Sequence, residues 1–170
     1  MTTARAGAPV ERQAAERPRR GGVLRLVGAG DVDHLDPALA YHTVTRGIVR
    51  AFTRQLVTYR STADHARAGE IVPDLATAAG GPFDAEARRY RFTLRAGVMW
   101  DAPASRPIVA ADVVRGIKRL AHPLAPSPGL PYFLSAIEGL VELRDALLAA
   151  ERRAEAIAEA MEATDVPGLI

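Results

Sequence analysis

The side chains best suited to chemistry in this sequence gather in one short stretch. Three aspartates and two histidines lie close together along the chain: Asp31, Asp33, His34, Asp36 and His42. Carboxylate and imidazole groups bind divalent cations and transfer protons. Their spacing matches no standard calcium or zinc pattern, and Pro37 indicates a turn between them. A metal site is therefore the less favoured interpretation of this stretch, and a turn is the favoured one.

A pair of glycines before this stretch raises the question of nucleotide binding. Gly28 and Gly30 follow a short apolar run, as in the dinucleotide-binding fingerprint. Asp33 stands where the third glycine belongs, and the acidic side chains nearby would repel a pyrophosphate. The sequence has no nucleophile elbow, no His-Glu-x-x-His motif, no P-loop and no cysteine. We therefore predict a protein that is not an enzyme and that needs neither a cofactor nor a metal.

The composition is that of one ordinary globular domain. The 170 residues fit the usual size of a single domain, and 48% hydrophobic and 25% charged residues are typical values. No stretch approaches the roughly 20 apolar residues of a membrane-spanning helix. The net charge is +2, and residues 1–22 carry an excess of +3, so the remainder carries −1. Because the basic excess lies in a tail, the sequence does not predict nucleic-acid binding.

Glycine, proline and alternating apolar residues divide the chain into a tail and a domain. Residues 1–20 are typical of a flexible tail, and we expect residues 21–170 to belong to one incomplete domain. Residues 23–27 predict a short strand between glycines, and residues 90–94 predict another strand, which ends in a turn at Gly97.

Apolar residues at helical spacing predict the helices. One helix runs from Thr43, the expected N-cap, and the next over residues 110–120. A further helical region extends from Ile137 to Met161. A row of arginines accompanies the first helix, and a solvated face is favoured for it over an anion site: Arg46, Arg50 and Arg54.

Several short motifs occur in an order that resembles one protein family. Residues 90–120 contain, in order, Tyr90, Phe92, Leu94, Arg95, Gly97, Val98, Trp100, Pro107, Ala110, Asp112 and Val113. Three motifs precede them: Leu35-Asp36-Pro37, Leu56-Val57-Thr58-Tyr59 and Pro73-Asp74-Leu75-Ala76, the last marking a helical turn. Together they resemble the bacterial extracellular solute-binding proteins of family 5, which serve peptide- and nickel-type ABC importers. The resemblance covers most of this chain and only the opening part of a typical member.

The resemblance implies an α/β fold: part of the first lobe of a periplasmic-binding-protein-like, type II, two-lobed structure with a mixed sheet flanked by helices. It implies the substrate-binding component of an ABC importer, which closes by a hinge on a small peptide or similar solute and meets the permease subunits. It also implies an extracytoplasmic location, in the periplasm or at the cell surface. The sequence itself has no apolar signal-peptide core and no lipid-anchor cysteine.

Two positions depart from the family pattern. Asp101 is followed by Ala102, where the family has a glycine, and Val109 replaces the threonine that usually caps the next helix. Loss of an N-cap hydroxyl costs about 1 kcal/mol of stability. Asp112 still complements the positive end of the helix dipole.

The loop after the first expected strand is the best candidate for contact with a ligand, because loops at strand ends line the clefts of α/β proteins. We expect ligand contact or a cleft wall at His34, Leu35 and Tyr41, with packing or turn structure as the alternative. Trp100 is expected to anchor the core. The alternative for the whole chain is a truncated or repurposed remnant that binds no solute alone and acts as an interaction or structural protein.

Overall fold

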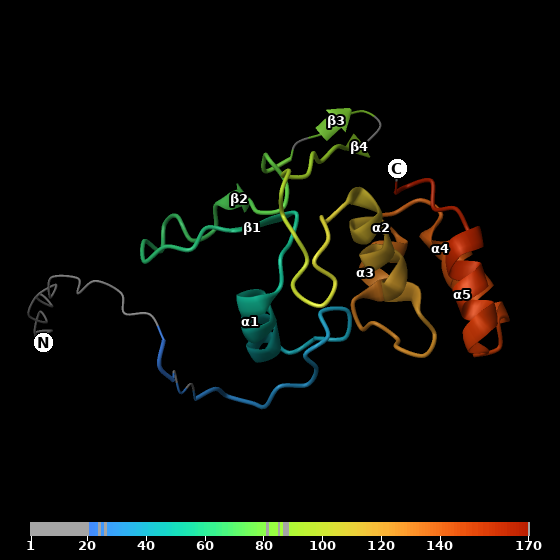
Figure 1. Ribbon diagram of the computed structural model, residues 1–170, viewed down its shortest axis with the longest axis horizontal. Helices are drawn as coiled ribbons and strands as arrows, with labels where there is room; N and C mark the ends of the chain where they lie inside the picture. Colours follow the sequence, from blue (N-terminus) through green and yellow to red (C-terminus); the bar gives the residue numbers. More distant parts are fainter. Residues whose placement is uncertain are drawn as a thin grey trace, which may run out of the picture.

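The computed structural model describes residues 21–23, 25, 27–80, 82–84, 86 and 89–169. The elements in chain order are α1 (Thr43–Phe52), β1 (Val57–Tyr59), β2 (Ile71–Pro73), β3 (Pro82–Asp84), β4 (Arg89–Tyr90), α2 (Ala110–Lys118), the 3-10 turn η1 (Arg119–Ala121), α3 (Leu130–Leu134), α4 (Leu140–Ala149) and α5 (Ala154–Ala163). Figure 1 places α1 and the β1–β2 hairpin on one side of the molecule and α2 to α5 on the other. The fold therefore contains both helices and strands, as the predicted α/β class requires.

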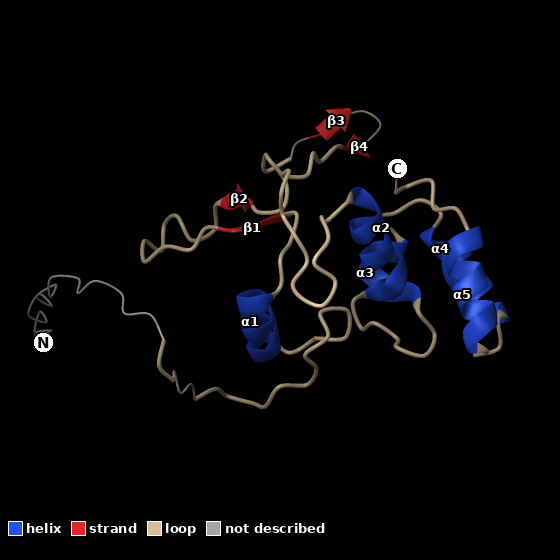
Figure 2. Cartoon of the chain, viewed as in Figure 1, coloured by secondary structure: helices blue, strands red, loops and turns tan. Residues whose placement is uncertain are grey.

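The described strands form two separate antiparallel pairs, not the single mixed sheet that the resemblance implies. In the first pair Tyr59 of β1 faces Ile71 of β2. The second pair joins β3 to β4. Figure 2 shows how short these strands are beside the loops that connect them.

The strand expected at residues 23–27 is missing at its described positions, and the strand expected at residues 90–94 is shorter than predicted. Val23 and Val27 lie outside any strand and are 87% and 102% exposed, so the strand prediction is wrong there. Leu24 and Leu26, like the expected tail at residues 1–20, lie outside the described residues. Of the expected strand at residues 90–94, only Tyr90 belongs to β4. Strands depend on a partner that supplies hydrogen bonds, which local alternation does not provide.

The predicted first helix is confirmed as α1, with a shifted start. Thr45 and Val49 form its buried face. The N-cap is His42 and not Thr43, and no side chain caps the first turn by a hydrogen bond from this position. The helix ends after Phe52, where the Thr53 hydroxyl donates a hydrogen bond to the carbonyl oxygen of Val49 at 2.9 Å.

The hydrophobic core lies among the helices of the second half of the chain. Leu140, Leu143 and Leu147 form the fully buried face of α4. Ile157 of α5 and Val166 complete the core, so the predicted helical region from Ile137 to Met161 is confirmed. Among the described residues, no helix combines the length and apolar character that crossing a bilayer requires.

Candidate functional site

The carboxylate of Asp33 binds the backbone just before the first turn of α1. Its Oδ2 accepts hydrogen bonds from the backbone N–H groups of Tyr41 at 2.8 Å and His42 at 3.2 Å. The backbone N–H of Asp33 donates to the hydroxyl of the buried Thr45 at 3.1 Å. The pKa of Asp33 lies well below its usual range, first because of the Thr45 side chain and then because of the two backbone N–H groups. These contacts fix the chain before residue 43, which explains why the N-cap is one residue earlier than predicted.

The turn predicted at the Leu-Asp-Pro motif is confirmed. Asp36 Oδ1 accepts a hydrogen bond from the backbone N–H of Ala38 at 3.0 Å. The carbonyl oxygen of Asp36 also accepts from the N–H groups of Leu39 and Ala40, at 3.0 and 2.9 Å. Aspartate commonly stabilises turns in this way, because its side chain mimics a backbone acceptor.

The structure places the three predicted contact residues in one loop but does not gather them around one cavity. Leu35 and Tyr41 are 62% and 52% exposed, and His34 is also exposed. Tyr41 lines an open hollow of about 350 Å³ at the start of α1, together with Ala29, Gly30, Asp31, His42, Thr43 and Val44. His34 and Leu35 lie outside the lining of this hollow. Tyr41 is therefore the best placed of the three for contact with a small molecule.

The acidic and histidine side chains of this loop are not arranged around a common point. Among the described residues no group of three histidine or acidic side chains is suited to hold a metal ion. Asp33 and Asp36 instead bind backbone N–H groups within the loop. Residues 31–42 therefore form turns and contacts that lead into α1.

Asp36 also reaches across the molecule to the end of α2. Its two carboxylate oxygens accept hydrogen bonds from the two Nη atoms of Arg119, and the Nη1–Oδ1 distance is 2.8 Å. The Arg119 side chain is the first cause that lowers the pKa of Asp36, and Asp36 raises the pKa of Arg119 in turn. A bidentate arginine–carboxylate pair of this kind fixes orientation as well as distance.

A second polar cluster surrounds Asp112 at the start of α2. Arg106 donates to both carboxylate oxygens, at 2.6 and 2.8 Å, and the N–H of Val109 donates at 2.9 Å. Asp112 therefore caps the helix from within, and compensates for the hydroxyl that Val109 lacks. The pKa of Asp112 lies well below its usual range, chiefly because of the Arg106 side chain.

Trp100 belongs to this cluster and not to the core. It is 44% exposed, its indole N–H donates to Asp112 at 3.2 Å, and the Arg106 guanidinium carbon lies 5.9 Å from its ring centre. The prediction of a core anchor is therefore wrong. Trp100 stays at the surface because Asp112 accepts from its indole N–H and Arg106 lies beside its ring.

The Pro-x-Leu-Ala motif, expected to form a helical turn, is held instead by polar contacts of Asp74. Its carboxylate accepts from the Arg54 side chain and, at 2.8 Å, from the N–H of Gln55. Its carbonyl oxygen accepts from Arg95 Nε at 2.7 Å. Residues 73–76 instead leave β2 through a bend and end in a bridge between Ala76 and Leu94, so the helical-turn prediction is wrong.

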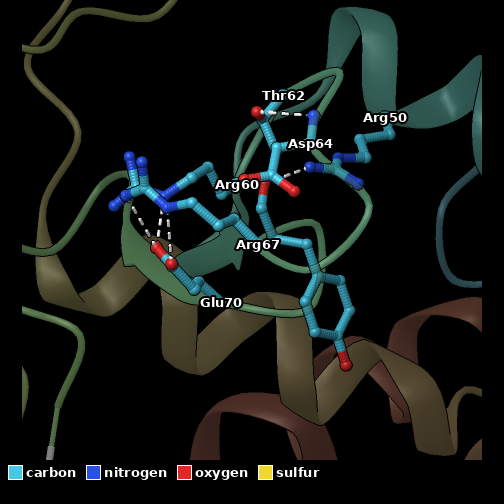
Figure 3. A network of polar contacts seen from close by, with 7 residues as sticks. Arg50, Arg60, Thr62, Asp64, Arg67 and Glu70 are labelled. Carbon is cyan, nitrogen blue, oxygen red and sulfur yellow. Dashed lines mark hydrogen bonds and ion pairs between the residues drawn. The ribbon is translucent and has the colours of Figure 1, made fainter.

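The arginine row of α1 is engaged in contacts within the chain. Arg50 donates to the carbonyl oxygen of Tyr59. Figure 3 shows Arg50 beside the hairpin loop, in which Arg60 and Arg67 both pair with Glu70. Arg46 lies 6.0 Å from the ring centre of Tyr41. All three arginines are exposed, so the predicted solvated face is confirmed, and Arg50 and Arg46 also contact Tyr59 and Tyr41 within the chain.

A second open hollow, of about 310 Å³, lies between α2 and α5. Its lining includes Lys118, whose ammonium donates to the carbonyl oxygens of Met161 at 3.2 Å and Thr164 at 2.8 Å. A cation at this position satisfies carbonyl groups that the end of α5 leaves free. The single lysine of the chain therefore joins two helices.

The acidic residues of these clusters were identifiable from the sequence, whereas their arginine partners were not. Arg119 and Arg106 carried no signal of their own, because 21 of the 22 basic residues are arginines. Asp112, by contrast, was recognisable from its place three residues after the expected helix cap.

In chemical terms the loop suits non-covalent contact. Asp33 Oδ2 and both carboxylate oxygens of Asp36 accept hydrogen bonds within the chain, while Asp33 Oδ1 is buried without a partner among the described residues. His34 and Tyr41 are exposed donors and acceptors. Comparisons with models of protein families, with curated proteins and with solved structures found no match.

Proposed function

We propose that this chain is part of the first lobe of a solute-binding protein that delivers short peptides or similar small solutes to an ABC importer. The observation that supports the proposal is that residues 90–120, the stretch with most of the matched residues, bind the earlier Leu-Asp-Pro and Pro-x-Leu-Ala motifs. Arg119 binds the carboxylate of Asp36, and Arg95 donates to the backbone carbonyl oxygen of Asp74. Within residues 90–120 themselves, Trp100 donates to Asp112. Residues that build one frame are expected to occur together in a family.

The frame leaves one segment free to meet a solute. Tyr41 borders the open hollow at the start of α1, and His34 and Leu35 are exposed in the turn before it. Aromatic and aliphatic side chains provide apolar contact, while imidazole and phenol groups supply hydrogen bonds that fix orientation. In a two-lobed receptor a second lobe closes over such a surface by a hinge motion, with no covalent step. A receptor for an importer acts outside the cytoplasm beside the permease subunits, and that location and those partners are part of the proposal.

A thermal-shift titration tests the proposal. The purified chain is heated with a panel of di- to pentapeptides, and with nickel(II) chloride as a separate probe. We expect a saturable rise of the melting temperature with at least one peptide pool, and its loss in Tyr41→Ala. The matched control is Tyr132→Ala, which removes a tyrosine that is 69% exposed on α3 and lies outside the lining of the hollow at the start of α1.

Exposed apolar side chains favour an interaction or structural remnant as the second candidate. Tyr59 and Ile71 face each other across the hairpin and are each 56% exposed, and Tyr90 is 65% exposed. Exposed apolar surface of this kind marks contact with another protein surface. Soluble oligomers with no response to any peptide or to nickel would support this second candidate and contradict the first.

A further inference from the structure

Two parts of the molecule do not share a hydrophobic core. The first, which we call the α1 segment, comprises residues 28–52, and its buried residues are Ala40, Thr45 and Val49. The second, the helical unit, comprises residues 110–169. Among the described residues, the main core cluster draws all its buried members from position 121 onward. Figure 1 shows α1 standing apart from α2 to α5.

The Asp36–Arg119 pair bridges these two parts. The two residues are 83 positions apart, and both carboxylate oxygens meet both Nη atoms of the guanidinium. A fork of two parallel hydrogen bonds restricts rotation as well as separation. The pair therefore restricts how the α1 segment is oriented on the helical unit.

Each partner is held firmly on its own side. Asp36 is fixed in the turn by the N–H groups of Ala38, Leu39 and Ala40. Arg119 begins η1, which continues α2 and ends at the buried Ala121 in the helical core. Each anchor is made within its own part, so breaking the pair leaves the contacts that hold each anchor in place.

The pair is accessible enough to open. The side chains of Arg119 and Asp36 are 46% and 26% exposed. Ion pairs near the surface are weak and are screened by salt. We propose that Asp36 and Arg119 form a latch that holds the α1 segment, with its exposed loop of His34 and Tyr41, against the helical unit and that opens reversibly. This inference does not rest on solute binding.

The charges around the latch favour its closed state at neutral pH. Arg119 faces the Asp36 carboxylate from η1, and His34 faces it from the same loop. The interaction with His34 is the smallest of the causes that lower the pKa of Asp36. Acid that protonates Asp36 removes the charge that Arg119 holds, so the latch opens as the pH falls.

Spin-label distances test the latch directly. The chain has no cysteine, so Gly47→Cys on α1 and Glu159→Cys on α5 provide two unique labelling sites. Both positions are exposed, and a Cβ at Gly47 meets no atom within 4 Å. Pulsed electron–electron double resonance at neutral pH should show one dominant distance between the two spin labels.

Neutralising the latch should broaden that distribution. Asp36→Asn keeps the oxygen that accepts from Ala38 but loses the charge, and Arg119→Gln removes the fork from the other side. In each variant we expect the ratio of closed to open molecules to fall by up to about fivefold, the size of an exposed ion pair. The exchange variant Asp36→Arg with Arg119→Asp should restore much of the narrow distribution.

The control is Glu70→Gln, which breaks an exposed ion-pair network within the hairpin loop and should leave the α1–α5 distance unchanged. Circular dichroism establishes that each variant is folded. If Asp36→Asn does not fold, Arg119→Gln and the unsubstituted labelled chain in 1 M salt decide the question. A distribution that stays equally narrow in those samples would overturn the latch.

Discussion

The indole N–H of Trp100 donates a hydrogen bond to Asp112 Oδ2 at 3.2 Å. The same carboxylate binds the loop arginine Arg106 and the N–H of Val109. One acidic side chain therefore joins Trp100, the loop that carries Arg106 and the first turn of α2. The motif from tryptophan to helix is a structural joint held by polar contacts at the surface.

Replacing Asp112 by Asn should loosen this joint. The neutral amide keeps one acceptor oxygen but no longer pairs ionically with Arg106, so Trp100 gains freedom and meets more water. The expected result is a red shift of the tryptophan fluorescence and faster amide exchange in the first turn of α2. Asp101→Asn, a change in the same loop, is the control. Emission that is identical in the Asp112→Asn variant and the parent would contradict the joint.

Introducing at position 109 the threonine that the resembled family usually carries there should stabilise the protein. Val109 has extended backbone angles, φ −123° and ψ 165°, and is 47% exposed, so threonine fits without strain. Its hydroxyl would accept a hydrogen bond from a free N–H of the first turn. We expect Val109→Thr to raise the free energy of unfolding by about 0.5–1 kcal/mol in urea denaturation. Val109→Ala should bring no such gain, and equal stability of the Thr and Ala variants would refute the cap.

The face of α4 that packs inward should dominate the stability of the helical unit. Leu143 is fully buried, so Leu143→Ala should lower the free energy of unfolding by about 2–5 kcal/mol. Leu148 on the same helix is 59% exposed, and Leu148→Ala should change it by no more than about 0.5 kcal/mol. Urea denaturation followed by circular dichroism measures both. Similar losses for the two leucines would show that the core has been assigned to the wrong face.

Acid should weaken the fold through its paired aspartates. Arg119 lowers the pKa of Asp36, and Arg106 lowers that of Asp112, so the folded state holds these protons less tightly than the unfolded chain. The stabilisation is present above the ordinary aspartate pKa of about 3.9 and is lost as the pH falls below it. Melting temperatures should therefore decline from pH 6 to about pH 3, with a smaller decline in Asp36→Asn. The same decline in Asp36→Asn and parent would exclude a contribution from Asp36.

The helices were predictable because their signals are local. Val44, Ile48 and Phe52 recur every fourth residue, as do apolar residues over 110–120, and both patterns gave helices. Gly97 adopts φ +76°, the conformation that a tight turn at glycine predicts. In each case, residues within one or two turns of the chain determine the outcome.

The remainder depended on distant partners. A strand at residues 23–27 needed a neighbour that the described chain does not offer it. Asp36 and Arg119 are 83 residues apart, and nothing in either local sequence points to the other. Asp74 bends its motif because Arg54 and Gln55 bind its carboxylate. The candidate loop was recognisable from its residue types, whereas its internal contacts were not.

We propose that the loop before α1 contacts a small peptide. The most direct measurement is a two-dimensional ¹H–¹⁵N NMR titration of the purified chain with the peptide pool that gives the largest thermal shift. We expect saturable shifts of the amide signals of His34, Leu35 and Tyr41, while those of Tyr132 and Leu148 on the helical unit stay in place. Shifts confined to the helical unit, or no saturable shift with any pool, would contradict it.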